Sequence, residues 1–194
     1  FEKAIATASL ERLNISTEII SELNKRKSLV DFYNQLDDTN YPLRIMHHDS
    51  KISNILFSSL TGDVKCIVDL DTIMPGKFFS DLGDMIRSMA CSVNENKTEW
   101  EKIFVKEDHY KSIIEGYIES MEHSFTTKET EHMHYAGPIM IYMQSLRFIT
   151  DFLNNDIYYH TNYKNQNFNR AKNQLVFLMQ LEAFLKKEYN ILEY

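Results

Sequence analysis

Polar side chains in the middle of the chain have the types and the order that phosphoryl transfer requires. Residues 44–57 contain His47, Asp49 and Asn54, and Asp69 follows 15 residues after Asn54. The reaction depends mainly on alignment of the reacting oxygens and on neutralisation of negative charge. A carboxylate can accept the proton of an attacking hydroxyl, and amide and carboxylate oxygens are ligands that Mg²⁺ prefers. The sequence therefore predicts a proton acceptor beside a magnesium site.

Each of these residues receives a role from its chemistry and its position. Asp49 is the candidate proton acceptor, and Asn54 and Asp69 are candidate ligands of Mg²⁺. Lys51 lies two residues after Asp49, where its ammonium could neutralise the transferring phosphoryl group. His47, Asp49 and Asn54 satisfy the pattern H-x-D-x-x-x-x-N of a kinase catalytic loop. Taken one at a time, such residues are more often loop caps and turn residues, so their joint order supports the hypothesis.

A further acid, Asp71, lies two residues after Asp69 at the end of an apolar run. In a continuing strand the two side chains would point to opposite faces. Asp71 joins the same metal site only if the chain turns, which Pro75 and Gly76 favour. Residues 66–76 are therefore predicted to form a metal-binding strand end.

The predicted catalytic loop lies between short apolar runs that indicate β-strands. These runs occupy residues 43–46, 55–57 and 64–68. The last two are separated by a turn at Thr61-Gly62-Asp63, which is typical of a hairpin. The sequence therefore places the loop and the second acid within one small β element.

The rest of the chain has helical periodicity. Apolar spacings of three and four before Tyr41 predict one or two amphipathic helices. Ser80 is expected to cap a helix with Asp81 in its first turn. Three further helical faces follow, at residues 110–121, 137–154 and 171–185. The predicted fold is mainly α with a small β element, in a single domain over residues 1–194.

Composition excludes several classes of protein. The net charge of −7 disfavours a broad contact with nucleic acid. Charged residues make up 25% of the chain, and no apolar stretch approaches bilayer length, so no membrane contact is expected. Cys66 and Cys91 are predicted to be small buried thiols in a reducing compartment, which suggests a cytoplasmic location.

Several blocks of the sequence resemble the N-acetylhexosamine 1-kinases of the aminoglycoside phosphotransferase and choline kinase superfamily. The catalytic-loop block differs from that of the aminoglycoside kinases, which usually carry Gly where His48 stands. The resemblance runs from about Leu43 to Glu182, and its blocks are residues 47–54, 67–76, 80–87, 146–159 and 168–175. It implies the carboxy-terminal lobe of the protein-kinase-like fold.

The resemblance also implies a reaction, which is ATP-dependent transfer to the anomeric hydroxyl of an N-acetylhexosamine in the presence of Mg²⁺. Arg147 and Tyr158 are implied to contact the sugar, and His47 and Asp81 to support the catalytic loop. Other interpretations stay open from the residues alone. Arg147 could be a helix-surface charge, Tyr158 a half-buried core aromatic, and Asp81 an ordinary acid near a helix start.

Two parts of a complete kinase are not found in this sequence. None of the five glycines has the G-x-G-x-x-G spacing, and no β-rich segment precedes the catalytic loop to hold a lysine for the phosphates. We therefore expect the amino-terminal lobe to be missing from this chain and the isolated chain to be inactive. Kinases for choline, homoserine or aminoglycosides, and a non-catalytic binding remnant, are the alternatives.

Overall fold

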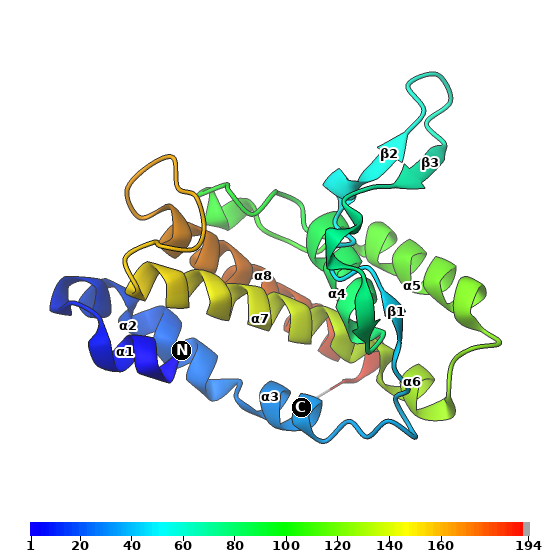
Figure 1. The fold of residues 1–194 in the computed structure, drawn as a ribbon, viewed down its shortest axis with the longest axis horizontal. Helices are drawn as coiled ribbons and strands as arrows, with labels where there is room; N and C mark the ends of the chain where they lie inside the picture. Colours follow the sequence, from blue (N-terminus) through cyan, green and yellow to red (C-terminus); the bar gives the residue numbers. More distant parts are fainter. Residues whose placement is uncertain (192–194) are drawn as a thin grey trace. The chain divides into compact units, whose positions relative to one another are not determined.

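The computed structural model describes residues 1–191 of the 194-residue chain. Two compact units emerge, and each is built from separate parts of the sequence (Figure 1). Unit 1 comprises residues 1–34, 93–104 and 141–194, and unit 2 comprises residues 35–92 and 105–140. The single domain expected from the sequence is thus described below as these two units.

In the part of unit 1 that the structure describes, all regular secondary structure is helical. Its elements are α1 (Glu2–Thr7), α2 (Leu10–Lys25), α3 (Ser28–Asn34), the 3-10 turn η3 (Trp100–Lys102), most of α7 (Ala136–Leu153) and α8 (Gln166–Tyr189). Three helices therefore occupy the leading segment, where one or two were predicted. An extended backbone at Ala8 ends α1, and the side chain of Ser9 caps α2 by accepting from the Arg12 amide.

The core of unit 1 lies where α2 packs against α8. Ile19 and Leu23 of α2 are buried there. The helical face predicted on α8 is confirmed, since its five apolar residues are all buried: Ala171, Leu175, Leu178, Leu181 and Leu185. At the edge of this packing, Arg26 pairs with both Glu22 and Glu182, which links the end of α2 to α8.

Unit 2 contains every strand of the described chain, together with six complete α- or 3-10 helical segments. Its elements are β1 (Arg44–Met46), η1 (Ile52–Asn54), β2 (Ile55–Phe57), β3 (Val64–Ile67), η2 (Leu70–Thr72), β4 (Met74–Gly76), α4 (Phe79–Met89), α5 (Glu107–Met121), α6 (Thr127–His132), η4 (Met133–Tyr135) and the first turn of α7. The three predicted strands and helix α5 are confirmed; of the apolar face predicted on α5, Tyr110 and Ile114 are buried and Ile118 is exposed.

The strands form two separate antiparallel pairs. Strands β2 and β3 make the predicted hairpin, and Gly62 takes a positive φ of 75° in its turn. Strands β1 and β4 form the second pair, in which Pro75 lies opposite Ile45. Residues 74–76 were expected to be a turn, so β4 is a correction. A proline is accepted there because each pair has only two strands and leaves unbonded edges.

Two further expectations about side chains need correction. Cys66 was predicted to be buried, yet it is exposed on β3, all four residues of which are exposed. Cys91 is buried as predicted, and both thiols are free. Among the described residues, no helix is both long enough and apolar enough to cross a membrane.

Candidate active site

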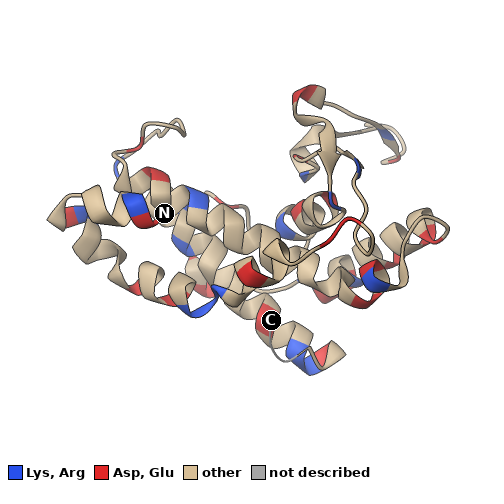
Figure 2. Cartoon of the chain, turned by 60° about the horizontal axis from the view of Figure 1, so that its bottom comes forward, with Lys and Arg blue, Asp and Glu red and all other residues tan. Residues whose placement is uncertain are grey.

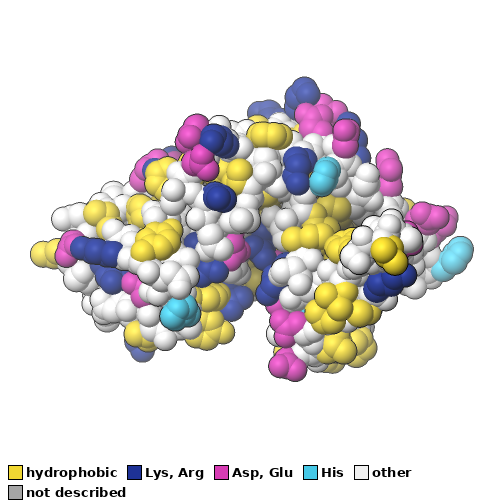
Figure 3. All heavy atoms as spheres, turned by 90° about the horizontal axis from the view of Figure 1, so that it is seen from above, with side chains coloured by type: hydrophobic (Ala, Val, Ile, Leu, Met, Phe, Trp, Pro, Cys, Tyr) yellow, Lys and Arg dark blue, Asp and Glu magenta, His cyan; other side chains and the backbone are white. Residues whose placement is uncertain are grey.

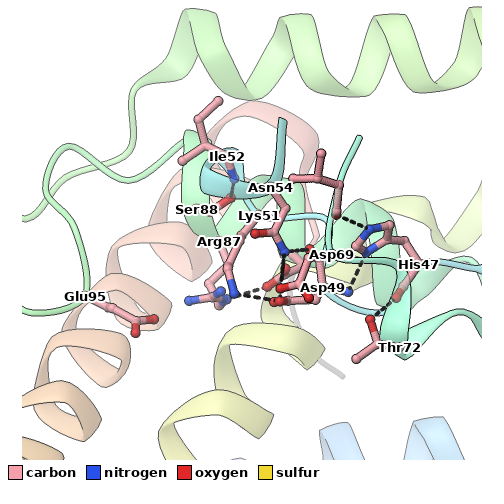
Figure 4. A network of polar contacts seen from close by, with 12 residues as sticks. His47, Asp49, Lys51, Ile52, Asn54, Asp69, Thr72, Arg87, Ser88 and Glu95 are labelled. Atoms are coloured by element: carbon pink, nitrogen blue, oxygen red, sulfur yellow. Dashed lines mark hydrogen bonds and ion pairs between the residues drawn. The ribbon is translucent and has the colours of Figure 1, made fainter. Parts of the chain in front are cut away.

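The predicted catalytic loop connects β1 to β2, and Asp49 lies at its centre (Figure 4). The side-chain nitrogen of Asn54 donates to the backbone carbonyl of Asp49 at 2.9 Å and to Asp49 Oδ2 at 2.9 Å. Lys51 Nζ pairs with the same Oδ2 at 2.6 Å. The structure thus brings together the proposed proton acceptor, its neighbouring cation and one proposed metal ligand.

Asp69 approaches this loop from the end of β3. Its Oδ2 lies 3.4 Å from Asn54 Nδ2, and the amide of the preceding residue, Val68, donates to the Asn54 carbonyl at 2.9 Å. Asp69 itself has left-handed backbone angles, with φ 64° and ψ 58°, which are uncommon for a residue other than glycine. The chain therefore turns sharply at Asp69 and continues as η2.

The donor set around Asn54 and Asp69 fits a hard divalent cation. The Asp49 carbonyl can only accept a hydrogen bond, so the amide nitrogen of Asn54 faces it; the same nitrogen lies 3.4 Å from Asp69 Oδ2, and the amide oxygen is on the side away from both acids. That oxygen and the Asp69 carboxylate are the kinds of ligand that Mg²⁺ takes, with waters completing its shell. Asn54 is buried, which helps to hold its amide in one orientation.

Asp71 follows the turn in η2 and is exposed. The turn required to bring it towards Asp69 is present. In residues 1–191, however, no three His, Cys, Asp or Glu side chains gather into a group that could hold a metal ion, so Asp71 does not join Asp49 and Asp69 in such a group. Its role as a ligand stays a prediction.

The backbone before Asp49 is fastened on two sides. The carboxylate of Asp81 accepts hydrogen bonds from the amides of His47 and His48, each at 2.8 Å. The His47 ring contacts the Val68 carbonyl at 3.0 Å, and Thr72 donates its hydroxyl to the His47 carbonyl at 2.5 Å. Asp81 and His47 therefore contact the loop that they were expected to support, and Thr72 is a contact that the sequence did not reveal.

Ser80 does not have the place predicted for it. Helix α4 begins at Phe79, its N-cap is Phe78, and no side chain caps it. Ser80 lies inside the first turn, and its hydroxyl is 2.7 Å from Nδ1 of His48. The residue chosen as a helix cap is instead a contact of the catalytic loop. Sequence offers no signal for this, because a serine near a helix start suits both roles.

A buried ion pair lies on α4 near the loop. Arg87 Nε contacts Asp84 Oδ1 at 2.7 Å, and both residues are buried. Burial raises the pKa of Asp84, the positive charge of Arg87 lowers it, and the charge of Asp49 raises it slightly. Asp49 is thus close enough for its charge to be felt at this pair. The sequence analysis did not identify either residue.

The residues expected to contact a sugar lie in unit 1, and the structure brings them together there. Arg147 projects from α7, and its guanidinium carbon is 6.0 Å from the centre of the Tyr158 ring and 5.6 Å from that of Tyr159. Tyr158 is 72% exposed, so it is not the half-buried core aromatic that was the alternative. An exposed guanidinium beside two phenol rings can contact hydroxyl and acetamide oxygens.

A buried polar network holds the loop that carries Tyr158. The carboxylate of Asp151 accepts from the amides of Tyr158 and Tyr159 at 2.8 and 2.9 Å, and from the Asn167 side chain at 2.9 Å. Asn167 also donates to Asp156, which pairs with Arg12 at 2.7 Å. Sequence reasoning missed Asp151. An acid one turn before an Asn-rich loop is a weak signal for this role.

Comparison with known families agrees with this site. Residues 8–108, just over half of the 194-residue chain, match the phosphotransferase enzyme family, APH, of the aminoglycoside phosphotransferase and choline kinase superfamily. The matched span includes the whole catalytic loop, Asp69 and Asp81. The chain belongs to this family and is a kinase-type phosphotransferase that acts on small molecules.

Proposed function

We propose that the chain is the carboxy-terminal, catalytic lobe of an ATP-dependent kinase that phosphorylates the anomeric hydroxyl of an N-acetylhexosamine. The observation that supports this most directly is the position of Asp49, which Asn54 and Lys51 hold beside Asp69. Family membership supports phosphoryl transfer to a small molecule. The choice of sugar is our proposal and is supported by the cluster of Arg147 and Tyr158.

The geometry of Asp49 suits a residue that receives a proton. In the described chain, both hydrogen bonds that reach its carboxylate end on Oδ2, one from Asn54 and one from Lys51. Oδ1 is therefore left to accept a hydrogen bond from the acceptor hydroxyl and to orient its oxygen for attack. Lys51 Nζ lies 2.6 Å from Oδ2 of this carboxylate, so a cation stands beside the oxygen that does not face the acceptor.

The nucleotide requires a metal ion and a surface for its base. Mg²⁺, which this family generally uses with ATP, neutralises phosphate charge when bound, and Asn54 and Asp69 are the residues that would hold it. Next to Asp69, the hairpin exposes apolar side chains on which a nucleobase or another part of the polypeptide could pack. They are Leu56 (47% exposed), Phe57 (48%), Val64 (62%) and Ile67 (50%).

This apolar surface supports the expectation of a missing amino-terminal lobe. Figure 3 views the molecule from the side on which the hairpin lies, and hydrophobic side chains gather on that face. Folded domains rarely leave a large contiguous apolar patch in water, because its burial is favourable by roughly 25 cal/mol per Å². We therefore propose that these strands pack against a further lobe in the complete polypeptide.

The proposal is tested by steady-state kinetics on the complete polypeptide with four acceptors: N-acetylglucosamine, choline, homoserine and an aminoglycoside. We expect the hexosamine to give the highest kcat/KM. Asp49→Asn should lower kcat by about 100-fold or more while ATP binding stays nearly unchanged. Asp108→Asn, an exposed acid in the first turn of α5, is the matched control and should have normal kcat.

Substitutions on the sugar side distinguish the reaction from the substrate. Arg147→Ala should lower kcat/KM for N-acetylhexosamines by roughly 10- to 100-fold and change the KM of ATP little. Tyr158→Phe, which keeps the ring, should have a smaller effect. A normal kcat in Asp49→Asn would remove the proposed mechanism. If Asp49→Asn is inactive but choline or another acceptor is preferred, only the choice of hexosamine is wrong.

A further inference from the structure

His48, the residue immediately before Asp49, has a backbone conformation that its side chain does not favour. Its φ is 64°, in the left-handed region where glycine and asparagine are the usual residues. A residue with a Cβ atom loses about 1–2 kcal/mol in this conformation. The backbone amides of His47 and His48 both donate to the Asp81 carboxylate. Because the chain is fixed there, its direction at Asp49 depends on the backbone angles of His48. Some contact of the ring must offset the backbone cost.

The imidazole of His48 lies between α4 and β4. On one side, Nδ1 is 2.7 Å from the hydroxyl of Ser80. On the other side is Gly76, where a Cβ atom would stand only 2.4 Å from His48 Cε1 and 2.6 Å from Nε2. Gly76 does not have a positive φ, so its backbone does not require glycine. The missing side chain at Gly76 is what gives the His48 ring its place.

The opposite nitrogen of the ring makes no hydrogen bond. Nε2 of His48 is buried against Gly76 and has no polar partner among residues 1–191. A buried polar atom without a partner is unfavourable by about 1–3 kcal/mol. If the side chain at position 48 served stability alone, an apolar side chain would be more favourable there than a histidine with an unpaired nitrogen. If the position required only a positive φ, glycine would be more favourable. The combination points to a geometric role.

We propose that His48 is a positioning residue, whose ring, held between Gly76 and Ser80, sets the direction of the Asp49 carboxylate. Glycine at this position could adopt the same φ but would not be held there, because it has no side chain to contact Ser80. Asparagine could do both, since it tolerates the left-handed region and its amide can reach a nearby hydroxyl. The inference rests on the proposed role of Asp49 as proton acceptor.

Substitutions at Gly76 and His48 test this through their coupling. Gly76→Ala should push the ring aside and lower kcat by about 10-fold or more, with little change in the KM of ATP or of the acceptor. His48→Gly should lower kcat by a similar factor. The kcat of the double variant should be no lower than that of His48→Gly alone, because without the ring the added methyl group displaces no side chain that positions Asp49. Gly116→Ala is the matched control, since a Cβ there has open space.

Further variants keep the test decisive if Gly76→Ala does not fold. Ser80→Ala retains the ring and removes its partner, and it should lower kcat by a smaller factor than His48→Gly. His48→Asn should restore most of the kcat that His48→Gly loses, which a purely structural ring would not predict. Melting temperatures measured alongside separate a kcat effect from loss of folded protein.

Three outcomes overturn the inference: normal kcat in folded Gly76→Ala, multiplication of the two losses in the double variant, or no recovery in His48→Asn relative to His48→Gly. Each of these is distinguishable from failure of the proposed function. If the proposed function fails, Asp49→Asn itself retains normal kcat, whereas any of the three outcomes above, found together with an inactive Asp49→Asn, refutes only the role of His48.

Discussion

At the scale of single residues, the contacts that hold Asp49 can be compared with the residues that we propose as metal ligands. Lys51 and Asp49 form an ion pair whose side chains are 36% and 27% exposed. Pairs of this kind contribute at most about 1 kcal/mol to folding. The pair therefore matters for the direction of the carboxylate more than for stability. Asn54 is different, because it contacts both Asp49 and Asp69 and so links the two functions.

The metal assignment predicts a change in the magnesium requirement. Asp69→Ala removes one anionic oxygen donor, so a higher Mg²⁺ concentration should be needed for half-maximal rate, and kcat should fall with it. Asp71→Asn, two residues along the chain, is the matched comparison. Magnesium titrations of both variants in the complete polypeptide measure the effect. If the Asp69→Ala titration overlays that of the parent, the ligand assignment is wrong, and a shift in Asp71→Asn would add that residue to the site.

At the scale of elements, hydrophobic periodicity predicted most of what packs. The helical faces of α5 and α8 and the hairpin of β2 and β3 were all anticipated, because each buries or pairs a regular set of side chains. Strand β4 was missed, since it has three residues, one of them proline. Helix α6 was missed as well. Its start depends on a capping box between Thr126 and Glu129 rather than on an apolar face.

The site was predictable in its residue types and only partly in its geometry. The order of Asp49, Asn54 and Asp69 could be read from the sequence because side-chain chemistry restricts which residues can do the reaction. The positive φ angles of His48 and Asp69 could not, since Asp and His adopt the left-handed conformation more often than most residues but still only rarely. These angles are imposed by hydrogen bonds from residues distant in the sequence, such as the two that Asp81 accepts.

The network under the sugar-side loop yields a prediction at this scale. Asp151→Asn replaces a carboxylate that accepts three hydrogen bonds with an amide that offers one oxygen and a competing donor. Amide exchange at Tyr158 and Tyr159 should become faster, and the unfolding free energy should fall by about 1–3 kcal/mol. If the proposed sugar contact is correct, KM for the hexosamine should rise more than KM for ATP.

Hydrogen exchange followed residue by residue, with chemical denaturation, makes this measurement on the described chain. Asp31→Asn, an exposed acid in α3 of the same unit, serves as the control and should change neither quantity by more than about 0.5 kcal/mol. If amide exchange at Tyr158 and Tyr159 were unchanged in Asp151→Asn, the side chains of the loop would be holding it in place, and not the carboxylate of Asp151.

At the scale of the whole molecule, charge and apolar surface point to different kinds of contact. Figure 2 shows that Lys, Arg, Asp and Glu are spread over the helices of both units. Many of them pair locally, as Arg44 does with buried Glu129 and Lys77 with Asp38. The net charge of −7 therefore reflects a mixed surface rather than a basic platform for a polyanion. By contrast, a large share of the exposed apolar residues falls within residues 43–74 of unit 2, on its strands and on the turns beside them.

This distribution predicts the behaviour of the 194-residue chain when it is purified by itself. It should be folded, because each unit has its own buried apolar residues, but it should bind an apolar dye such as anilinonaphthalene sulfonate through the β2–β3 hairpin. Phe57→Lys and Val64→Lys, which place charges on exposed positions of that hairpin, should reduce dye binding without lowering the melting temperature. The same substitution at exposed Ile15 of α2 is the control.

The same chain should transfer no phosphoryl group, because its sequence has no glycine-rich loop, and no β-rich segment before the catalytic loop carries a lysine to hold the nucleotide phosphates. The measurement compares phosphorylation of N-acetylglucosamine by the 194-residue chain and by the complete polypeptide at equal concentrations of folded protein. We expect activity only in the latter, together with weaker dye binding per molecule, since a second lobe would cover the hairpin. Robust ATP-dependent phosphorylation by the 194-residue chain would refute the missing-lobe proposal, and equal dye binding by both proteins would show that the lobe packs elsewhere.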